Sequence, residues 1–164
     1  MSEANLLSIR SATIDDLALL HAMIRELADF EGEAGAVTIR EEDLARDGFG
    51  DNPKFRALIA EWNGEAAGYA VFFEYYSTWA GRALFLEDLF VREAFRRRGV
   101  GTALLSAVAR IALAENCYGI HWEVLDWNET AINLYKSMGA VFRDSWRPVL
   151  LMDEALRRVA ERSC

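Results

Sequence analysis

The chain has 164 residues, of which 52% are hydrophobic and 27% are charged. This length and composition fit one globular domain with a single core, and they exclude a disordered chain. The net charge of −8 argues against nucleic-acid binding, which needs a basic face, whereas an acidic protein can attract a cationic small substrate.

Targeting signals, disulfides and metal ligands are not evident. No run of 18 apolar residues suggests a membrane span, and "MSEANLLSIR" at the start lacks the pattern of a signal peptide. The two cysteines, Cys117 and Cys164, make no disulfide framework and have no metal-ligand neighbours at a useful spacing. His21 and His121 stand alone and are interpreted as structural or surface residues. We therefore expect a cytoplasmic protein without a metal.

The chain opens with a short strand, "LLSIRSA", and a helix. Thr13 and Asp16 have the spacing of a capping box, which predicts a helix N-terminus. Apolar residues three and four positions apart then give the helix one apolar face: Leu17, Leu20, Ile24 and Leu27. The glycines in residues 32–35 end it.

A shorter helix and three strands are expected next. Thr38 with Glu41 repeats the capping pattern, and "DGFGDNP" ends that helix. Asn63-Gly64 is a strong hairpin signal between the first two strands. The three strands are "FRALIAEW", the aromatic-rich "AAGYAVFFEYYSTW", and "ALFLEDLFV", whose apolar character favours a central position.

The second half alternates helices and strands. After "RRRGVG", one helix face is traced by Val100, Leu104, Val108 and Ile111. We expect a strand at "GIHWEVLD", a helix at "NETAINLYKSMG" that Gly139 ends, one or two closing strands at "AVFRDSWRPVLLM", and an exposed helical tail. This order predicts an α/β (α+β) fold, a mixed sheet flanked by helices in one domain over residues 1–164.

The stretch "RRRGVG", Arg96 to Gly101, joins a strand to a helix. Glycine lets the backbone approach a ligand closely, and the first N–H groups of the helix favour an anion such as phosphate. A P-loop is absent, and a dinucleotide fingerprint would need glycine where Leu104 stands. From these residues alone, a phosphate site and a plain basic turn both remain open.

The pattern [RQ]-x-x-G-x-[GA], here Arg96, Gly99 and Gly101, resembles the acetyl-coenzyme A signature of the GNAT superfamily of N-acetyltransferases. Further motifs over about residues 6 to 150 resemble the spermidine/spermine N-acetyltransferase family: "LADFE", "DGFGDNP", "YYSTWAGR", "LEDLFV", "VLDWNETAINLYKSMGA" and the late Trp146. "YSTW" and "VLDWN" are closer to its thialysine (a lysine analogue) acetyltransferase branch. The polyamine branch tends to carry an acidic residue at the position of Ser77, so this serine disfavours a polyamine preference.

The resemblance implies a GNAT-like, mostly antiparallel sheet and acetyl-CoA as co-substrate. Backbone amides from Arg98 to Thr102 would hold the pyrophosphate, and the amides of Leu89 and Val91 would bind the pantetheine arm as though it were another strand. The implied coenzyme-binding residues are Leu89, Phe90, Val91, Arg96, Arg97, Arg98, Gly99, Val100, Gly101, Thr102, Asn128, Thr130, Ala131, Tyr135 and Lys136.

Acetyl transfer to an amine requires two proton transfers, because a free alkylamine with a pKa of about 10.4 must lose a proton and the departing thiolate must gain one. By resemblance, Glu87 is the base, acting through water, and Tyr135 is the general acid. The residues alone leave two other interpretations open. Glu87 and Asp88 could be edge-of-sheet charges, and Tyr135 could be a core aromatic on one face with Ile132 and Met138.

The family's amine channel corresponds to Glu31, Trp79, Glu87, Asp88 and Trp146. Tryptophan faces suit alkylammonium ions, although simple packing explains each Trp equally well, and Glu31 could be only a helix-end charge. The family also implies a homodimer whose sites use both chains. A homodimer would cover the aromatic strand "YAVFFEYYSTW".

Three functions follow from these observations. The first is an N-acetyltransferase that acts by direct attack in a ternary complex on a small cationic amine, meaning a lysine-like amino acid, a diamine or a polyamine. The second is a protein or peptide N-acetyltransferase on the same fold. The third is a non-catalytic acyl-CoA-binding module, against which Glu87 and Tyr135 argue because a pure binder needs neither.

Overall fold

The computed structural model describes residues 6–162. The chain forms two compact units, Met1–Glu123 and Val124–Cys164, and each is described by itself. Cys164 lies outside the described residues, and Cys117 is a buried free thiol. Within residues 6–162, no helix combines the length and the apolar character needed to cross a membrane.

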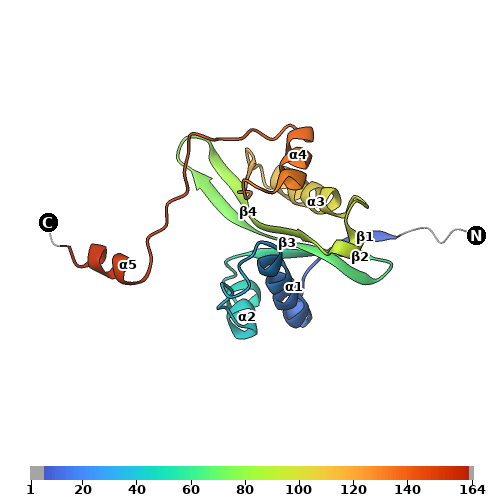
Figure 1. Ribbon diagram of the computed structural model, residues 1–164, viewed down its shortest axis with the longest axis horizontal. Coiled ribbons are helices and arrows are strands. Elements are labelled where there is room, and N and C mark those ends of the chain that lie inside the picture. The colour runs from blue at the N-terminus through green and yellow to red at the C-terminus, as the bar shows by residue number, and fades with distance from the viewer. Residues whose placement is uncertain (1–5, 163–164) are drawn as a thin grey trace, which may run out of the picture. The chain divides into compact units, whose positions relative to one another are not determined.

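The first unit is built on a five-stranded sheet of order β1-β2-β3-β4-β5 (Figure 1). Its strands are β1 Leu7–Ser11, β2 Arg56–Trp62, β3 Glu65–Ser77, β4 Gly81–Val91 and β5 Ile120–His121. Neighbours from β1 to β4 are antiparallel, and β5 runs parallel to β4. The expected mixed, mostly antiparallel sheet is thereby confirmed. The expected hairpin joins β2 to β3, where Asn63 and Gly64 both have positive φ, 52° and 81°.

Helices cover both faces of this sheet. The helices α1 (Leu17–Phe30) and α2 (Glu41–Phe49) lie on one face and α3 (Val100–Ala114) on the other (Figure 1). On the α1 face, Leu20 and Met23 pack against Ile59 and Tyr69, and all four side chains are fully buried. This cluster places α1 directly over β3, the strand next to the acidic residues of β4.

The N-terminus of α1 forms as the sequence predicts. The Thr13 backbone N–H donates to Asp16 Oδ2 at 2.8 Å, and a short 3-10 turn, Ile14–Asp16, leads into the helix. The Arg10 guanidinium donates to both oxygens of the same carboxylate, at 2.7 and 2.8 Å. Arg10 therefore holds the pKa of Asp16 down to about 2 and ties β1 to α1.

The expected cap of α2 is wrong. The helix begins at Glu41, and its cap pairs Arg40 with Asp43: the Arg40 N–H donates to Asp43 Oδ2 at 3.0 Å. Asp43, at the third helical position, accepts the N–H of the residue three positions before it, which is Arg40. The Thr38 and Glu41 spacing therefore marks no cap.

The expected strands after α3 are mostly absent. The strand predicted at "GIHWEVLD" is reduced to Ile120–His121, and residues 140–152, predicted to hold one or two strands, pair with no strand in the described part of the chain. Strand-forming residues need the edge of a neighbouring strand before their propensity counts. The second unit consists of α4 (Glu129–Ser137) and the expected helical tail, α5 (Asp153–Ala160).

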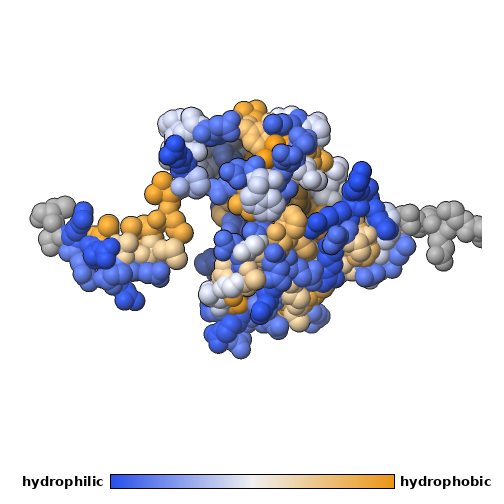
Figure 2. Space-filling view, in the orientation of Figure 1, coloured by the Kyte–Doolittle hydropathy of each residue, from blue (hydrophilic) through white to orange (hydrophobic). Residues whose placement is uncertain are grey.

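The segment before α5 is strongly apolar and exposed. Val149 is 91% exposed and Leu150 is 79% exposed, and Figure 2 shows this stretch as the orange run that leads into the tail. An exposed apolar segment of this kind usually marks an interaction surface.

Candidate active site

A β-bulge in β4 organises the acidic site. Phe72 of β3 pairs with Leu86 and Val71 pairs with Asp88, so Glu87 is an extra residue without an opposite partner. The bulge places Asp88 on the same face as Val71, toward α1, while Leu86 is buried on the other face with Phe72. In a regular strand, Leu86 and Asp88 would share a face.

The same bulge reverses the direction of the backbone N–H groups. Leu84 donates to the carbonyl of Gly119, on the β5 side, at 3.1 Å. Arg92 lies eight residues further on and would point the same way in a regular strand, yet it donates to Ala67 beside β3 at 2.9 Å. The direction therefore changes once between these residues, at Glu87.

The N–H groups of Leu89 and Val91 consequently point away from β3. In the described part of the chain, β5 pairs with β4 only at Leu84 and Phe85, so no strand occupies the edge beyond Leu86. Two outward amides on an open edge can bind an extended ligand as if it were a strand. Phe90 between them points its side chain into the α1-face core and offers only its backbone.

Asp88 and Glu31 form an acidic pair on this face. The pKa of Asp88 is raised to about 6. Burial is the largest cause, the charges of Glu87 and Glu31 act in the same direction, and a hydrogen bond from Tyr69 opposes them. Burial and the nearby Glu33 also raise the pKa of Glu31, which caps the C-terminus of α1. Glu87 itself is exposed. Within residues 6–162, no three His, Cys, Asp or Glu side chains are arranged to hold a metal ion.

The sequence pattern did not single out Tyr69. Its hydroxyl donates to Asp88 Oδ2 at 3.0 Å although the two residues are 19 positions apart. Their contact depends on the register of β3 against β4 after the bulge. No local motif encodes that register.

Trp79 does not lie beside Asp88 and Glu31 of its own chain. It lies in the β3–β4 turn and is 87% exposed. Along β3, the turn residue Ser77 is six positions from Val71, the partner of Asp88, which is about 20 Å in a strand. Ser77 has a structural part in the turn, because its Oγ accepts the N–H groups of Trp79 and Ala80 at 3.2 and 3.3 Å.

The N-terminus of α3 is shaped for an anion. Gly99, its N-cap, has φ 80°, in the left-handed region that favours glycine. The first hydrogen bond of the helix runs from the Ala103 N–H to the Gly99 carbonyl, and no side chain of residues 6–162 caps the end. The N–H groups of Val100, Gly101 and Thr102 are therefore left for a ligand or water.

The three arginines before this helix differ in their contacts. Arg96 donates from Nε to the Val91 carbonyl at 3.0 Å and lies 4.6 Å from the Phe30 ring centre, so it fixes the loop to β4 and α1. Arg98 lies over the Trp62 ring at 5.4 Å. Arg97 is exposed and has no ring or carboxylate contact in the described part. Arg97 is therefore the arginine most open to a phosphate.

The second unit carries the predicted residues of α4. Asn128 is the N-cap of α4, and its Oδ1 accepts the Ala131 N–H at 3.2 Å, so its amide nitrogen is the part left to donate. Thr130 lies exposed in the first turn. Tyr135 is 6% exposed, and burial raises its pKa, which keeps its phenol protonated at neutral pH.

Two further predicted residues belong to the second unit: Lys136 in the last turn of α4, and Trp146 in the segment after this helix. Lys136 places its Nζ 5.6 Å from the Phe142 ring centre. Trp146 is 64% exposed, and the Arg143 guanidinium lies 5.0 Å from its ring centre. Trp146 thus already contacts one cation of its own chain.

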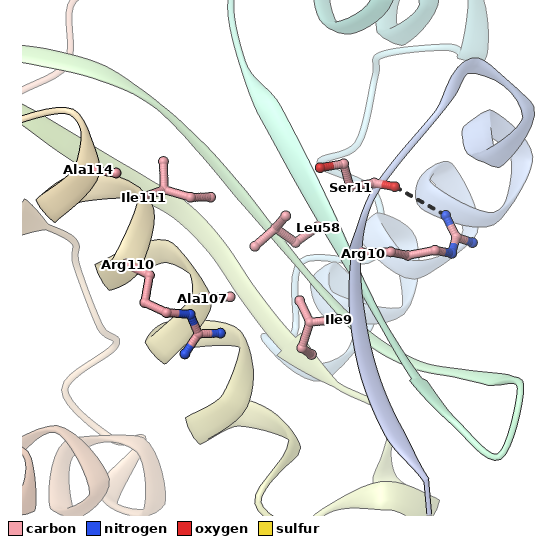
Figure 3. Close-up of a pocket in the computed structure, with 8 residues that line it drawn as sticks. All are labelled: Ile9, Arg10, Ser11, Leu58, Ala107, Arg110, Ile111 and Ala114. Atoms are coloured by element: carbon pink, nitrogen blue, oxygen red, sulfur yellow. Dashed lines mark hydrogen bonds between the residues drawn. The ribbon is translucent and has the colours of Figure 1, made fainter.

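A separate groove of about 330 Å³ lies between α3 and the strands β1 and β2 (Figure 3). Ile9 and Leu58 of the strands face Ala107 and Ile111 of α3. The groove contains none of the predicted site residues. Its lining is Ile9, Arg10, Ser11, Leu58, Ala107, Arg110, Ile111 and Ala114.

Residues 20–140 match the model of the acetyltransferase (GNAT) family. The chain belongs to this family. It is 41% identical to mouse thialysine N-epsilon-acetyltransferase over 94% of this chain and 97% of that protein. It is 38% identical to human spermidine/spermine N(1)-acetyltransferase-like protein 1 over 81% of this chain and 20% of that protein.

Solved structures support the same fold. An integron cassette protein of V. cholerae aligns with a TM-score of 0.78 and 23% identity, covering 95% of this chain and 98% of that one. An aminoglycoside N-acetyltransferase in complex with CoA aligns with a TM-score of 0.72 and 20% identity, covering 94% and 99%. The family model and the identity to the mouse enzyme show that the protein is an N-acetyltransferase. Acetyltransferases of this family use acetyl-CoA.

The helix N-terminus gives a direct test of coenzyme binding. A Cβ on Gly101 would meet only Val91 Cγ2, at 3.6 Å, an ordinary contact, so Gly101→Asp is expected to fold. Its carboxylate would repel a phosphate at the amides, and we expect at least a hundredfold loss of acetyl-CoA affinity, or about 3 kcal/mol. Calorimetry measures the affinity. Gly35→Asp, at a position with open space, is the matched control; equal affinities of the two variants would contradict the assignment.

Proposed function

We propose that this GNAT enzyme acetylates the primary amine of a small cationic substrate by direct attack in a ternary complex. The observation that carries this proposal is the pair Asp88 and Glu31 on the α1 face, beside the open edge of β4. Neither carboxylate has an Arg or Lys partner in the described part of the chain, although each is at least partly desolvated. Such a pair favours a bound ammonium group.

The residues at the edge of β4 and at the start of α3 fit the coenzyme. The Leu89 and Val91 amides would hold its arm, and the Val100, Gly101 and Thr102 amides would hold its pyrophosphate, with Arg97 nearby in sequence. Asn128, Thr130, Ala131 and Lys136 of α4 are proposed as further contacts. Acetyl-CoA supplies the thioester carbonyl that an amine attacks.

The protein's own groups would move the protons. Asp88 binds the ammonium form, and Glu87, exposed to solvent, accepts the amine proton through water. An amide on the open edge of β4 would polarise the carbonyl. Tyr135, whose pKa is raised by burial, keeps its proton until the thiolate departs and then donates it. This role requires the two units to form one catalytic domain, which we also propose.

We propose a cytoplasmic homodimer. A homodimer would cover the exposed apolar segment at Val149 and Leu150 and the exposed aromatic residues Tyr76 and Trp79. It would also explain how Trp79, about 20 Å from Asp88 along the strand, reaches an amine site, namely that of the partner. The cytoplasm suits the buried free thiol of Cys117.

Light scattering at micromolar concentration should therefore give twice the chain mass of 18.5 kDa. Val149→Asp with Leu150→Asp should shift the mass to that of one chain, because two carboxylates would be desolvated in the interface. A single-chain mass for the wild-type protein would contradict the homodimer.

A short primary amine should be a better substrate than spermine. A long polyamine needs an anionic partner for each distal ammonium group, and loss of one such contact lowers kcat/KM roughly ten- to a hundredfold. A thiol-release assay with acetyl-CoA would compare lysine, thialysine, ornithine, putrescine, spermidine, spermine and a peptide. A peptide as the best substrate would overturn the small-amine proposal.

Position 77 can be tested in the same assay. An Asp side chain can accept the two turn N–H groups that Ser77 accepts, so Ser77→Asp should keep the turn and add a charge. We expect the variant to shift the kcat/KM ratio toward spermine. Ser77→Asn keeps an acceptor without the charge and is the matched control; equal ratios in both would remove position 77 from substrate choice.

Tyr135→Phe should lower turnover by about 10²-fold, because a general acid contributes at least that much. Acetyl-CoA affinity should stay near the wild-type value, since the ring is retained. Steady-state kinetics and calorimetry separate the two effects. Tyr76→Phe, at a tyrosine 66% exposed, is the control; full turnover of Tyr135→Phe would remove the phenol from the reaction.

A further inference from the structure

Tyr69 is a fully buried tyrosine whose hydroxyl contacts the acidic pair. Its ring belongs to the core cluster with Leu20 and Met23 and lies 6.1 Å from the Phe90 ring centre. The hydroxyl donates to Asp88 Oδ2 at 3.0 Å. In the described part of the chain, no other group hydrogen-bonds this carboxylate. Packing of the ring in the core thus holds the Tyr69 hydroxyl in place, and its hydrogen bond orients the Asp88 carboxylate.

This contact exists because of the bulge. Val71 is the direct partner of Asp88, and Tyr69 lies two residues before Val71 in β3, on the same face. Diagonal neighbours of this kind are about 7–8 Å apart, within the reach of a tyrosine side chain. In a regular strand, Asp88 would face the opposite side of the sheet from Tyr69.

The charged side chains that shift the pKa of Asp88 are both carboxylates. Glu31 at the end of α1 and Glu87 beside it on β4 both raise its pKa. Glu26 of α1 acts on Tyr69 but is neutralised by Arg92, whose guanidinium lies at 2.7 and 2.9 Å from its carboxylate. Arg96, in the loop before α3, donates to the Val91 carbonyl and lies over the Phe30 ring. Among the described residues, only the Tyr69 hydroxyl opposes protonation of Asp88.

We propose that Tyr69 is a positioning residue for the acetyl-transfer reaction: its hydroxyl orients the Asp88 carboxylate and keeps it ionised, so that the other oxygen receives the ammonium group of the substrate. This rests on the proposed function, since it assigns Asp88 to the amine. Tyr69 touches neither substrate nor coenzyme and acts only through Asp88.

The test is Tyr69→Phe, which keeps the ring in the core and removes the hydroxyl. The pKa of Asp88, about 6 in the wild-type protein, must then rise because the group that lowers it is gone. A charge-assisted hydrogen bond is strong enough to move the titration midpoint upward by about one pH unit. At pH 6.5, the ionised fraction of Asp88 falls roughly threefold, while at pH 8.5 it is almost unchanged.

The first readout is equilibrium binding of the best amine from the substrate panel to the full chain saturated with CoA. Calorimetry measures this binding at pH values from 5.5 to 8.5. Alkylamines remain protonated over this range, because their pKa is about 10.4, so the pH dependence of binding reports titration of groups on the protein. We expect Tyr69→Phe to bind about threefold more weakly at pH 6.5 and equally at pH 8.5. Asp88→Asn should remove the pH dependence, and Tyr76→Phe should leave it unchanged.

The second readout needs no substrate. NMR titration of carboxyl carbons, with Asp88 assigned by its loss in Asp88→Asn, should show a higher midpoint in Tyr69→Phe. An unmoved midpoint, or equal amine affinities at pH 6.5, overturns the positioning role. If the midpoint moves but the wild-type protein binds no small amine, the proposed function fails and the coupling of Tyr69 to Asp88 stands.

Discussion

The extra residue at Glu87 is the constraint on which the site in the first unit depends. Two consequences follow from a single β-bulge, because side chains and N–H groups both alternate along a strand. It directs Asp88 to the α1 face, and it directs the Leu89 and Val91 amides to the open edge. Without it, these amides would be paired with β3, and a carboxylate would lie on the face where Leu86 is 2% exposed.

The acidic pair weakens the fold that carries it. The folded-state pKa of Asp88, about 6, is above its ordinary value of 3.8, so the folded protein binds this proton more tightly than the unfolded chain. Its contribution to stability therefore decreases as the pH rises from 3.8 through 6. Above that range, the ionised carboxylate costs up to about 3 kcal/mol. Such a group is retained where a bound cation compensates it.

The arginines of the loop before α3 have different roles: Arg96 holds the loop in place, and Arg97 is exposed and open to a ligand. Arg96 is used to attach the loop to Val91 and Phe30, which leaves the helix N-terminus in a defined place. Gly99 and Arg97 both adopt positive φ, so the chain turns sharply and directs the first amides of the helix outward. The run of three arginines thus contains one anchor, Arg96, and two exposed cations, of which Arg98 lies over the Trp62 ring and Arg97 has no ring contact in the described part of the chain.

The sequence by itself predicted the family, the order of the elements in the first unit, the hairpin at Asn63-Gly64 and the glycine turn before α3, because each depends on residues close together in the chain. It also predicted which residues carry the chemistry, and these assignments remain proposals. It failed at the cap of α2 and at the strands expected in residues 140–152, because strand propensity counts only where a segment pairs with a neighbouring strand, and these residues pair with none in the described chain. Only the tertiary structure placed Asp88 against Tyr69, used Arg96 as an anchor and separated Trp79 from Asp88. Those outcomes depend on strand register, and one inserted residue changes register without leaving any local pattern in the sequence.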